Sequence, residues 1–398
     1  MIKTPDIYKR PLARSELMWL VMDKINPPFG IAILLEGEGE LNKKLWEDAA
    51  IKVSETNPGT RLKLKGFLKN RYWIDTGIPP KVVEIDASDW SGLSSENAPF
   101  LQRDLSPFTG PTSEILLLQG ENPKICFRSN HAVMDGRGIL MWIEDMFRAL
   151  RGENTISTNS NINADQLARL FQKKHRDFEP SVHIAPTGIA KGNDRGCIWK
   201  RIQFNGRFSK LLPKLAIIIA NEAKKHSDGP VKIAVPVDLR HRNKNIHSSA
   251  NLSIAIYLDI NQSSTPDQIA DKIKNQIQKQ NDCVLTRGMF WFEILPTWFM
   301  TMLVKKSIQK QHQKGLYSVS ALLSNLGIIP IHKFHGGGFV ANNCLGIPPD
   351  IENIPCFISL NGRKDGVDLI VSIPKVLSSD GRIDELLDSI SLGLQKKG

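Results

Sequence analysis

Segments with strand-like and helical patterns of apolar residues alternate along most of the chain, and this alternation predicts a mixed α and β fold. Residues 29–38 are typical of a strand, and residues 41–57 of an amphipathic helix. Alternating apolar and polar residues on both sides of a polar turn predict hairpins over residues 62–75 and 113–130. We expect an earlier helix to begin with Ser15 as its N-cap.

A polar segment rich in Asn and Ser, residues 153–165, interrupts this pattern and is typical of a linker. Helical and strand patterns resume after it, so both halves of the chain have the same α+β texture. We therefore predict an N-terminal lobe over residues 1–165, a linker or crossover over residues 166–195 and a C-terminal lobe over residues 196–398.

Composition and charge exclude several classes of protein. The chain is 41% hydrophobic and 23% charged, as soluble globular proteins are. Its formal net charge is +11, but lysine and arginine are dispersed and no nucleic-acid motif accompanies them, so we predict no nucleic-acid partner. The charge fits a phosphate-rich cofactor, an acidic protein partner or a solvated surface. The first residues do not form a signal peptide, and the five cysteines include no CxxC pair. Both features favour a cytoplasmic protein without zinc or disulfides.

Residues 288–304 form the most apolar stretch of the chain. The stretch is shorter than a membrane-spanning helix and contains Glu293 and Pro296, so we predict no transmembrane segment. A pair of buried helices is the favoured interpretation, and contact with a membrane surface is the alternative. We assign its aromatic residues to the core, with a substrate pocket as the alternative; they are Phe290, Trp291, Phe292, Trp298 and Phe299.

The segment SNHAVMDGRG, residues 129–138, follows a strand-like run. His131 lies at the predicted end of that strand, where a histidine can serve as a general base, because imidazole titrates near neutral pH. Asp135 and Gly136 can form the turn that follows. From these residues alone, a histidine that merely packs beside a turn is the slightly favoured interpretation, because a single histidine followed by Asp-Gly is common.

The segment resembles the HHxxxDG motif of the chloramphenicol acetyltransferase-like superfamily, which includes condensation domains of nonribosomal peptide synthesis and alcohol acyltransferases. DLSPFTGPTSEILLL before it, and VPVDLRHRNKNIHSSANL and SALLSNLGIIP after it, resemble further segments of the superfamily in the same order. The resemblance covers most of the chain. It implies an α+β fold, an α/β sandwich, with two chloramphenicol acetyltransferase-like lobes and a tunnel between them.

The resemblance also implies roles for individual residues. His131 matches the second, catalytic histidine, and Asp135 matches an aspartate that holds the motif through an ion pair with an arginine, for which Arg240 is the candidate. Gly136 matches the glycine of the motif. Ser324 and Asn325 match polar residues near the reacting carbonyl.

One residue departs from the motif, because Asn130 stands where the first histidine is expected. On a strand that continues through residue 131, the Asn130 side chain points away from that of His131. We therefore expect activity to survive this difference. Compared with the complete motif, the asparagine gives slightly more weight to the alternative of a catalytically inactive binding protein.

By the same resemblance, the activity is transfer of an acyl group from a thioester to an alcohol, with His131 as the general base. The donor is acyl-CoA or an acyl group on the phosphopantetheine arm of a carrier protein, and we expect no tightly bound cofactor and no metal. The partners are small-molecule donor and acceptor, with an acyl or peptidyl carrier protein as a further candidate, and we expect a monomer. A free-standing condensation enzyme that forms an amide and a noncatalytic carrier-protein-binding scaffold are the alternatives.

The HGGG sequence at residues 335–338 is similar to the oxyanion loop of lipases. Lipases also need a GxSxG nucleophile, which this chain lacks, so we interpret the segment as a flexible loop.

Overall fold

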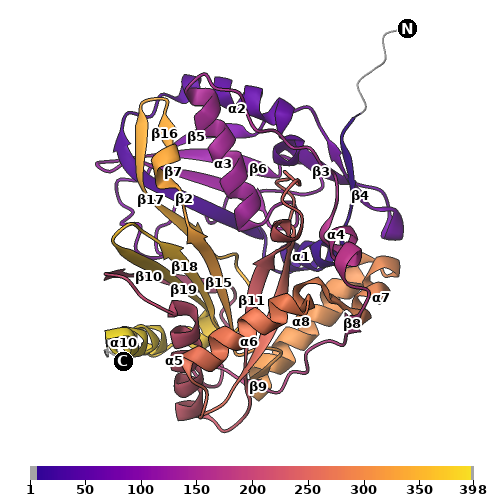
Figure 1. Ribbon diagram of the computed structural model, residues 1–398, viewed down its shortest axis with the longest axis vertical. Helices are drawn as coiled ribbons and strands as arrows, with labels where there is room; N and C mark the ends of the chain where they lie inside the picture. The colour runs from indigo at the N-terminus through magenta and orange to yellow at the C-terminus, as the bar shows by residue number, and fades with distance from the viewer. Residues whose placement is uncertain (1–6, 396–398) are drawn as a thin grey trace.

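Two six-stranded sheets, each covered by helices on one face, form the two lobes of the protein (Figure 1). The structure is a computed structural model and describes residues 7–395, with all side chains except those of Met289 and Phe290. The two lobes lie one above the other, and the N-terminal half supplies most of the upper one. The α+β class and the two-lobed architecture predicted from the sequence are confirmed.

The sheet of the first lobe has the strand order β16-β17-β2-β7-β6-β5. Helices α2 (Lys43–Thr56) and α3 (Gly136–Leu150) cover one of its faces and bury an apolar core against it. Strands β6 and β7 pair antiparallel, which confirms the predicted hairpin. The strands are β2 (Gly30–Gly39), β5 (Lys81–Asp86), β6 (Ser113–Gln119), β7 (Lys124–Asn130), β16 (His335–Gly336) and β17 (Phe339–Ile347).

A small sheet with the order β1-β4-β3 lies beside this lobe and contains the other predicted hairpin. Its strands are β1 (Lys9–Pro11), β3 (Leu62–Lys65) and β4 (Tyr72–Asp75). Helix α1 (Arg14–Ile25) follows β1.

The N-cap of α1 is Ala13, so the prediction of Ser15 was wrong. The side chain of Glu16, three residues into the helix, accepts a hydrogen bond from the Ala13 amide at 2.9 Å, which is the half of a capping box that needs no polar N-cap side chain. Glu16 is fully buried and is held there by Arg10 and by Trp73, whose indole N–H donates to it at 3.0 Å. Tertiary contacts, rather than the local sequence, therefore decide where this helix begins.

The sheet of the second lobe has the order β10-β19-β18-β15-β11-β12 and is covered on one face by α5, α6 and α10. The strands are β10 (Cys197–Asn205), β11 (Val231–Asp238), β12 (Ser253–Ile260), β15 (Ala321–Ile328), β18 (Phe357–Gly362) and β19 (Gly366–Pro374). The helices are α5 (Leu211–His226), α6 (Pro266–Gln278) and α10 (Arg382–Gln395). The remaining elements are α4 (Ala164–Phe171), β8 (His175–Arg176), β9 (His183–Ile184), β13 (Leu285–Thr286), α7 (Phe290–Ile294), α8 (Thr297–Lys314), β14 (Leu316–Tyr317) and α9 (Lys375–Ser378).

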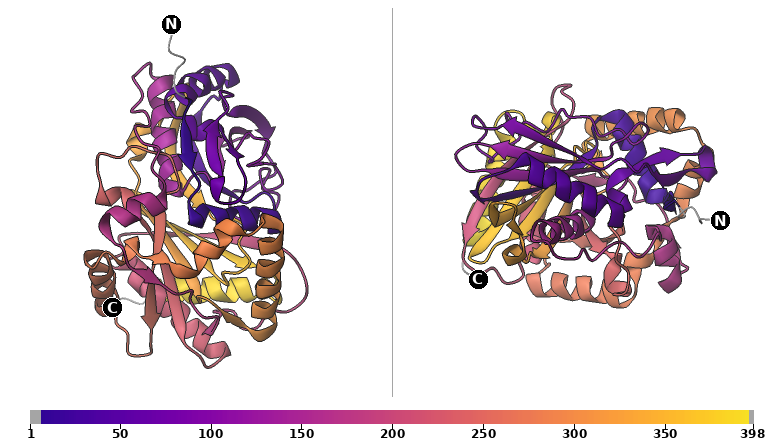
Figure 2. Two further views of the ribbon diagram at one scale, coloured as in Figure 1. Left: turned by 90° about the vertical axis from the view of Figure 1, so that its right-hand side faces the viewer. Right: turned by 90° about the horizontal axis from the view of Figure 1, so that it is seen from above.

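Between β15 and β18 the chain leaves the second lobe and adds β16 and β17 to the sheet of the first. Strand β17 pairs antiparallel with β2, and the two views of Figure 2 show the late part of the chain reaching the early part. The sequence boundaries at residues 165 and 196 did not include this exchange. The division of the chain at these boundaries remains a prediction. The sheet of the first lobe, however, includes two strands from the C-terminal half.

Within the HGGG segment, His335 and Gly336 form β16, and Gly337 and Gly338 form the tight turn to β17. The segment is therefore a paired hairpin, and its interpretation as a flexible loop was wrong. Gly337 and Gly338 have φ angles of +61° and +83°, which residues with a Cβ rarely adopt, and the turn packs against Leu150 of α3.

The apolar stretch at residues 288–304 forms α7 and the beginning of α8. Trp291 and Trp298 are 62% and 69% exposed, so their assignment to the core was wrong. Phe292 and Phe299 are half-buried, and the side chain of Phe290 lies outside the described part of the structure. Within residues 7–395, no helix is long and apolar enough to cross a membrane. The five cysteines are unbridged, and four of them are buried.

Candidate active site

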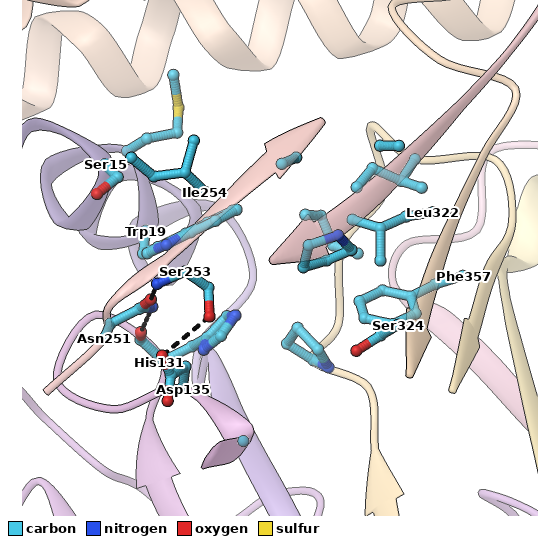
Figure 3. A pocket seen from close by; sticks show the side chains of 18 of the residues that line it. Ser15, Trp19, His131, Asp135, Asn251, Ser253, Ile254, Leu322, Ser324 and Phe357 are labelled. Carbon is cyan, nitrogen blue, oxygen red and sulfur yellow. Dashed lines mark hydrogen bonds between the residues drawn. The ribbon is translucent and has the colours of Figure 1, made fainter. Parts of the chain in front are cut away.

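A cavity of about 610 Å³ lies between the two lobes, and both lobes contribute to its walls. Strand β2 and the end of β7 line one side, and β11, β12, β15 and β18 line the other. Figure 3 shows His131, Trp19 and Asn251 on one wall, with Leu322, Ser324 and Phe357 across the open space. Apolar surface predominates in the walls, which also carry polar and charged residues, among them Arg14, Arg176 and Glu179.

His131 directly follows β7, at the strand end where the sequence predicted it. Its backbone is fixed at both ends, because its amide donates to the Phe29 carbonyl at 3.0 Å and its carbonyl accepts from the Asn251 side chain at 2.8 Å. The imidazole stacks on the indole of Trp19, with 5.2 Å between ring centroids. The ring is therefore held in one orientation at the cavity wall.

The protonation state of the His131 ring follows from its hydrogen bond. Nδ1 lies 3.0 Å from the carbonyl oxygen of Met134. A carbonyl oxygen only accepts, so in the neutral ring Nδ1 carries the proton and Nε2 keeps its lone pair. No group among residues 7–395 hydrogen-bonds to Nε2.

Burial lowers the pKa of His131 from its ordinary value of 6.5, because it disfavours the charged imidazolium. The Met134 carbonyl and the Asp135 carboxylate act in the opposite direction but do not reverse the shift. The ring is consequently neutral at pH 7, which is the form that can accept a proton.

Asp135 holds the turn between β7 and α3 through both carboxylate oxygens. Oδ1 accepts from the Gly138 amide at 2.7 Å and caps α3. Oδ2 accepts from the Leu252 amide at 2.8 Å, from Ser253 Oγ at 2.9 Å and from Arg240 Nη1 at 3.1 Å. Burial by itself would raise the pKa of Asp135, but Arg240 and these donors hold it below its usual range.

Arg240, the partner that the resemblance implied for Asp135, is buried and makes contacts on every side. Its Nη1 also donates to Asp238 at 2.7 Å, and its remaining N–H groups donate to the carbonyls of Ser248 and Ala250. The guanidinium thus ties the loop before β12 to the turn that carries His131.

Gly136 is the first residue of α3 and does not have a positive φ, so the turn does not need the conformational freedom of glycine at this position. A Cβ at Gly136 would lie 3.0 Å from the end of the Leu326 side chain. The stricter requirement falls on Gly138, where a Cβ would lie 2.2 Å from the backbone oxygen of Ser249. No local pattern marks Gly138, because glycine is required there only by the close approach of the Ser249 backbone in the folded protein.

Asn130 is fully buried and does not line the cavity. Its amide group donates to Asp23 Oδ1 at 3.0 Å and to the Leu105 carbonyl at 3.2 Å, and its side-chain oxygen accepts from the Ala132 amide at 3.1 Å. The side chain points away from His131, as the strand alternation predicted, and it fastens the end of β7 to α1.

Ser324 and Asn325 lie on β15 and line the same cavity as His131. Ser324 is on the opposite wall (Figure 3). The Asn325 side-chain oxygen accepts from the Gly327 amide at 2.9 Å, which leaves its NH₂ group as the donor available to a ligand.

Asn251 lies near the end of the segment VPVDLRHRNKNIHSSANL and Ser253 directly follows it, and the sequence assigned no role to either residue. The structure brings both to His131 and Asp135, where their hydrogen bonds fix the motif (Figure 3). The only hint in the sequence was that Asn251 is a polar residue in a loop between two strand-like segments, residues 231–238 and 253–260.

A second cavity of about 660 Å³ lies on the other side of the segment 347–349, which borders both cavities. Its walls carry several charged residues, among them Arg195, Lys200 and Asp350. Burial raises the pKa of Asp350 to about 6. No group of three or more His, Cys, Asp or Glu residues within 7–395 is arranged to hold a metal ion.

No protein-family model and no curated protein sequence matches this chain. Solved structures do match over nearly its whole length. The first condensation domain of the calcium-dependent antibiotic synthetase, in complex with a substrate analogue, superposes with a TM-score of 0.69 at 12% identity, over 97% of this chain and 96% of that one. The chain has the fold of a condensation domain.

Two further structures with the condensation-domain fold are similar to this chain. The starter condensation domain of rhizomide synthetase RzmA, a mutant in complex with C8-CoA and Leu-SNAC, has a TM-score of 0.67 at 12% identity, over 98% of this chain and 94% of that one. The epimerization domain from the third module of tyrocidine synthetase B has a TM-score of 0.62 at 14% identity, over 98% and 96%. At these identities the comparison establishes the fold, and the chemistry must be argued from the residues.

Proposed function

We propose that the protein is an acyltransferase that moves an acyl group from a thioester to an acceptor hydroxyl, with His131 as the general base. The observation that carries the proposal is the state of His131 in the cavity between the lobes. Its ring is neutral at pH 7, Nδ1 is committed to Met134, and Nε2 is left to accept a proton. A base in this state typically contributes about 10²–10⁴-fold in rate.

The reaction needs one proton transfer in each direction. Nε2 of His131 accepts the acceptor's proton as its oxygen attacks the thioester carbonyl, which forms a tetrahedral oxyanion. The oxyanion collapses, the carbon–sulfur bond breaks, and the imidazolium returns the proton to the leaving thiolate. We assign Asp135 and Arg240 to positioning, because their hydrogen bonds are directed to the backbone around the motif.

The remaining site residues fit this reaction. The NH₂ group of Asn325 is a candidate donor to the oxyanion. Ser324 lies on the cavity wall opposite His131. A correctly placed donor of this kind is worth about 3 kcal/mol in other enzymes. Apolar residues such as Leu322 and Phe357 suit an acyl chain, and the net charge of +11 suits either the phosphates of coenzyme A or an acidic carrier protein.

An amine acceptor is the second candidate, and the similarity to condensation domains of peptide synthetases favours it. The same base serves both acceptors, because attack by an amine also releases a proton. In that case the product is an amide between the acyl group and the amine.

The test is incubation of the purified protein with panels of acyl-CoA and acyl-carrier donors plus alcohols and amines, with products read by mass spectrometry. An ester supports the first candidate and an amide the second. His131→Ala should reduce product formation at least about 100-fold. His335→Ala, which changes a histidine of β16 outside the cavity, is the matched control and should retain activity. Full activity of His131→Ala would refute the mechanism, and carrier binding without any product would instead identify a noncatalytic scaffold.

A further inference from the structure

An exposed apolar surface lies on α7, α8 and the tip of the hairpin between β3 and β4. We call it the tryptophan patch, and it consists of Phe67, Trp291, Ile294, Trp298 and Met302. Phe67 and Trp298 are each 69% exposed and Trp291 is 62% exposed. The turn at residues 68–70 packs against α7 and places Phe67 beside the two helices. Figure 1 shows α7 at the right-hand edge of the molecule, and the left view of Figure 2 faces this side.

The exposure of these residues is not a by-product of loose packing. Other apolar residues of the same two helices, Phe292, Met300 and Val304, pack on the core of the first lobe, so the helices have an inner apolar face of their own. All eight tryptophans of the chain lie within residues 7–395, and the six outside the patch are buried or half-buried. The two exposed tryptophans therefore both belong to the consecutive helices α7 and α8. Exposed apolar surface of this kind marks a site of contact with a partner or a membrane.

Lysines border the tryptophan patch on two sides. Lys65 and Lys69 flank Phe67, and Lys305, Lys306 and Lys310 follow Met302 along α8; all five are exposed. None of them forms an ion pair with an acidic residue of the described chain. The nearby Glu293 is already engaged by Arg14 at 2.8 Å. The border of the patch is therefore positively charged.

We propose that the tryptophan patch docks the protein on the surface of an anionic lipid bilayer. Tryptophan and phenylalanine favour the boundary between headgroups and acyl chains, because their rings are apolar and the indole N–H remains hydrated. Each lysine near an anionic surface contributes about 1 kcal/mol. Apolar residues in the centre with unpaired lysines around them are complementary to such a surface, and neither feature requires a spanning helix.

The tryptophan patch lies next to one end of the cavity between the lobes. Phe292 of α7 contacts the ring of Phe178 with 6.1 Å between centroids, and Glu293 binds Arg14. Phe178 and Arg14 both line the cavity. A docked bilayer would thus lie beside this end of the cavity, the nearest part of it to a lipid-dissolved donor or acceptor. That last step rests on the proposed acyl transfer, whereas docking itself does not.

The experiment is flotation of the full-length protein with vesicles of phosphatidylcholine alone and of phosphatidylcholine mixed with phosphatidylglycerol. We expect the protein to float with the mixed vesicles and much less with the neutral ones. Tryptophan fluorescence should shift to shorter wavelength on binding and be quenched by brominated acyl chains. The assay requires no turnover, so failure of docking and failure of the proposed reaction are distinguishable.

Variants separate the apolar from the charged contribution. Trp298→Ser should weaken vesicle binding about tenfold, since burying a large side chain is worth roughly 1.5–3 kcal/mol. Lys305→Glu with Lys306→Glu should abolish the preference for anionic vesicles. Leu392→Ser, on α10 and equally exposed at 62%, is the matched control and should bind as the unchanged protein does. All these side chains are exposed, and unchanged thermal unfolding would show that the variants fold. Absence of flotation with either vesicle, or equal losses in Trp298→Ser and Leu392→Ser, would overturn the proposal.

Discussion

Replacement of Asp135 by asparagine tests whether this carboxylate holds the active-site turn together. Asparagine has the same shape but no charge, and its NH₂ group would face a donor instead of accepting from it. Asp135 accepts from Gly138 at one carboxylate oxygen and from Leu252, Ser253 and Arg240 at the other, so the single oxygen of asparagine can keep only one of these two sets. The change also leaves the buried Arg240 guanidinium without one of its two acidic partners.

The expected loss of stability follows from these contacts. Removing one partner of a buried ion pair costs about 3–5 kcal/mol when the other charge is left alone. Arg240 keeps Asp238 at 2.7 Å and two backbone carbonyls, which lowers the loss. We therefore expect Asp135→Asn to reduce the free energy of unfolding by about 2–3 kcal/mol, and Asp135→Ala by about 3–5 kcal/mol.

The assay is urea unfolding at pH 7, with Asp380→Asn as the matched control. Asp380 forms an ion pair of 2.9 Å with Lys191, but both side chains are about two-thirds exposed, so this control should lose less than about 1 kcal/mol. Adding Arg240→Met to Asp135→Asn should cost less than the sum of the two single changes, because the uncompensated charge disappears. If Asp135→Asn were no less stable than the control, the assignment of Asp135 to positioning would be wrong.

The site supports three further predictions. Because burial holds the pKa of His131 below 6.5, kcat/KM should rise with pH up to that pKa and stay level above it. A pH profile with its inflection above 6.5 would contradict the proposed base. Gly138→Ala should reduce stability by about 3 kcal/mol, because the new Cβ would lie 2.2 Å from the Ser249 backbone oxygen. Gly136→Ala should cost about 1 kcal/mol, since the Leu326 side chain can move away from the new Cβ. Thermal unfolding of both variants checks the difference. Asn130→Ala should cost about 1–3 kcal/mol in urea unfolding, since it removes the Asn130 donor from the Leu105 carbonyl and leaves the buried Asp23 Oδ1 with the Phe29 amide. A neutral effect would show that the side chain does not fasten β7.

The tertiary structure also changes how two of these residues are understood. Asn130 stands where a histidine was expected, and its side chain serves the packing of β7 against α1 and not the cavity. Gly136 matches the motif, yet the closest approach of another segment is at Gly138. Both results depend on neighbours far away along the chain, which no local pattern contains.

The sequence by itself determined the elements whose signals are local. The alternation of apolar residues defined the hairpin of β6 and β7, and the helical spacing over residues 41–57 defined α2, because burial of one face imposes these periods. It also placed His131 at a strand end, and the resemblance in several ordered segments gave the fold.

Only the tertiary structure decided what depends on contacts between distant segments. It brought Arg240 to Asp135 across 105 residues, joined β17 to the first sheet and set Asn251 against the His131 carbonyl. It also left Trp291 and Trp298 on the surface, although their apolar segment predicted a core. Periodicity shows that a residue is apolar at a given spacing, but which face of a helix is covered is decided by what packs against it.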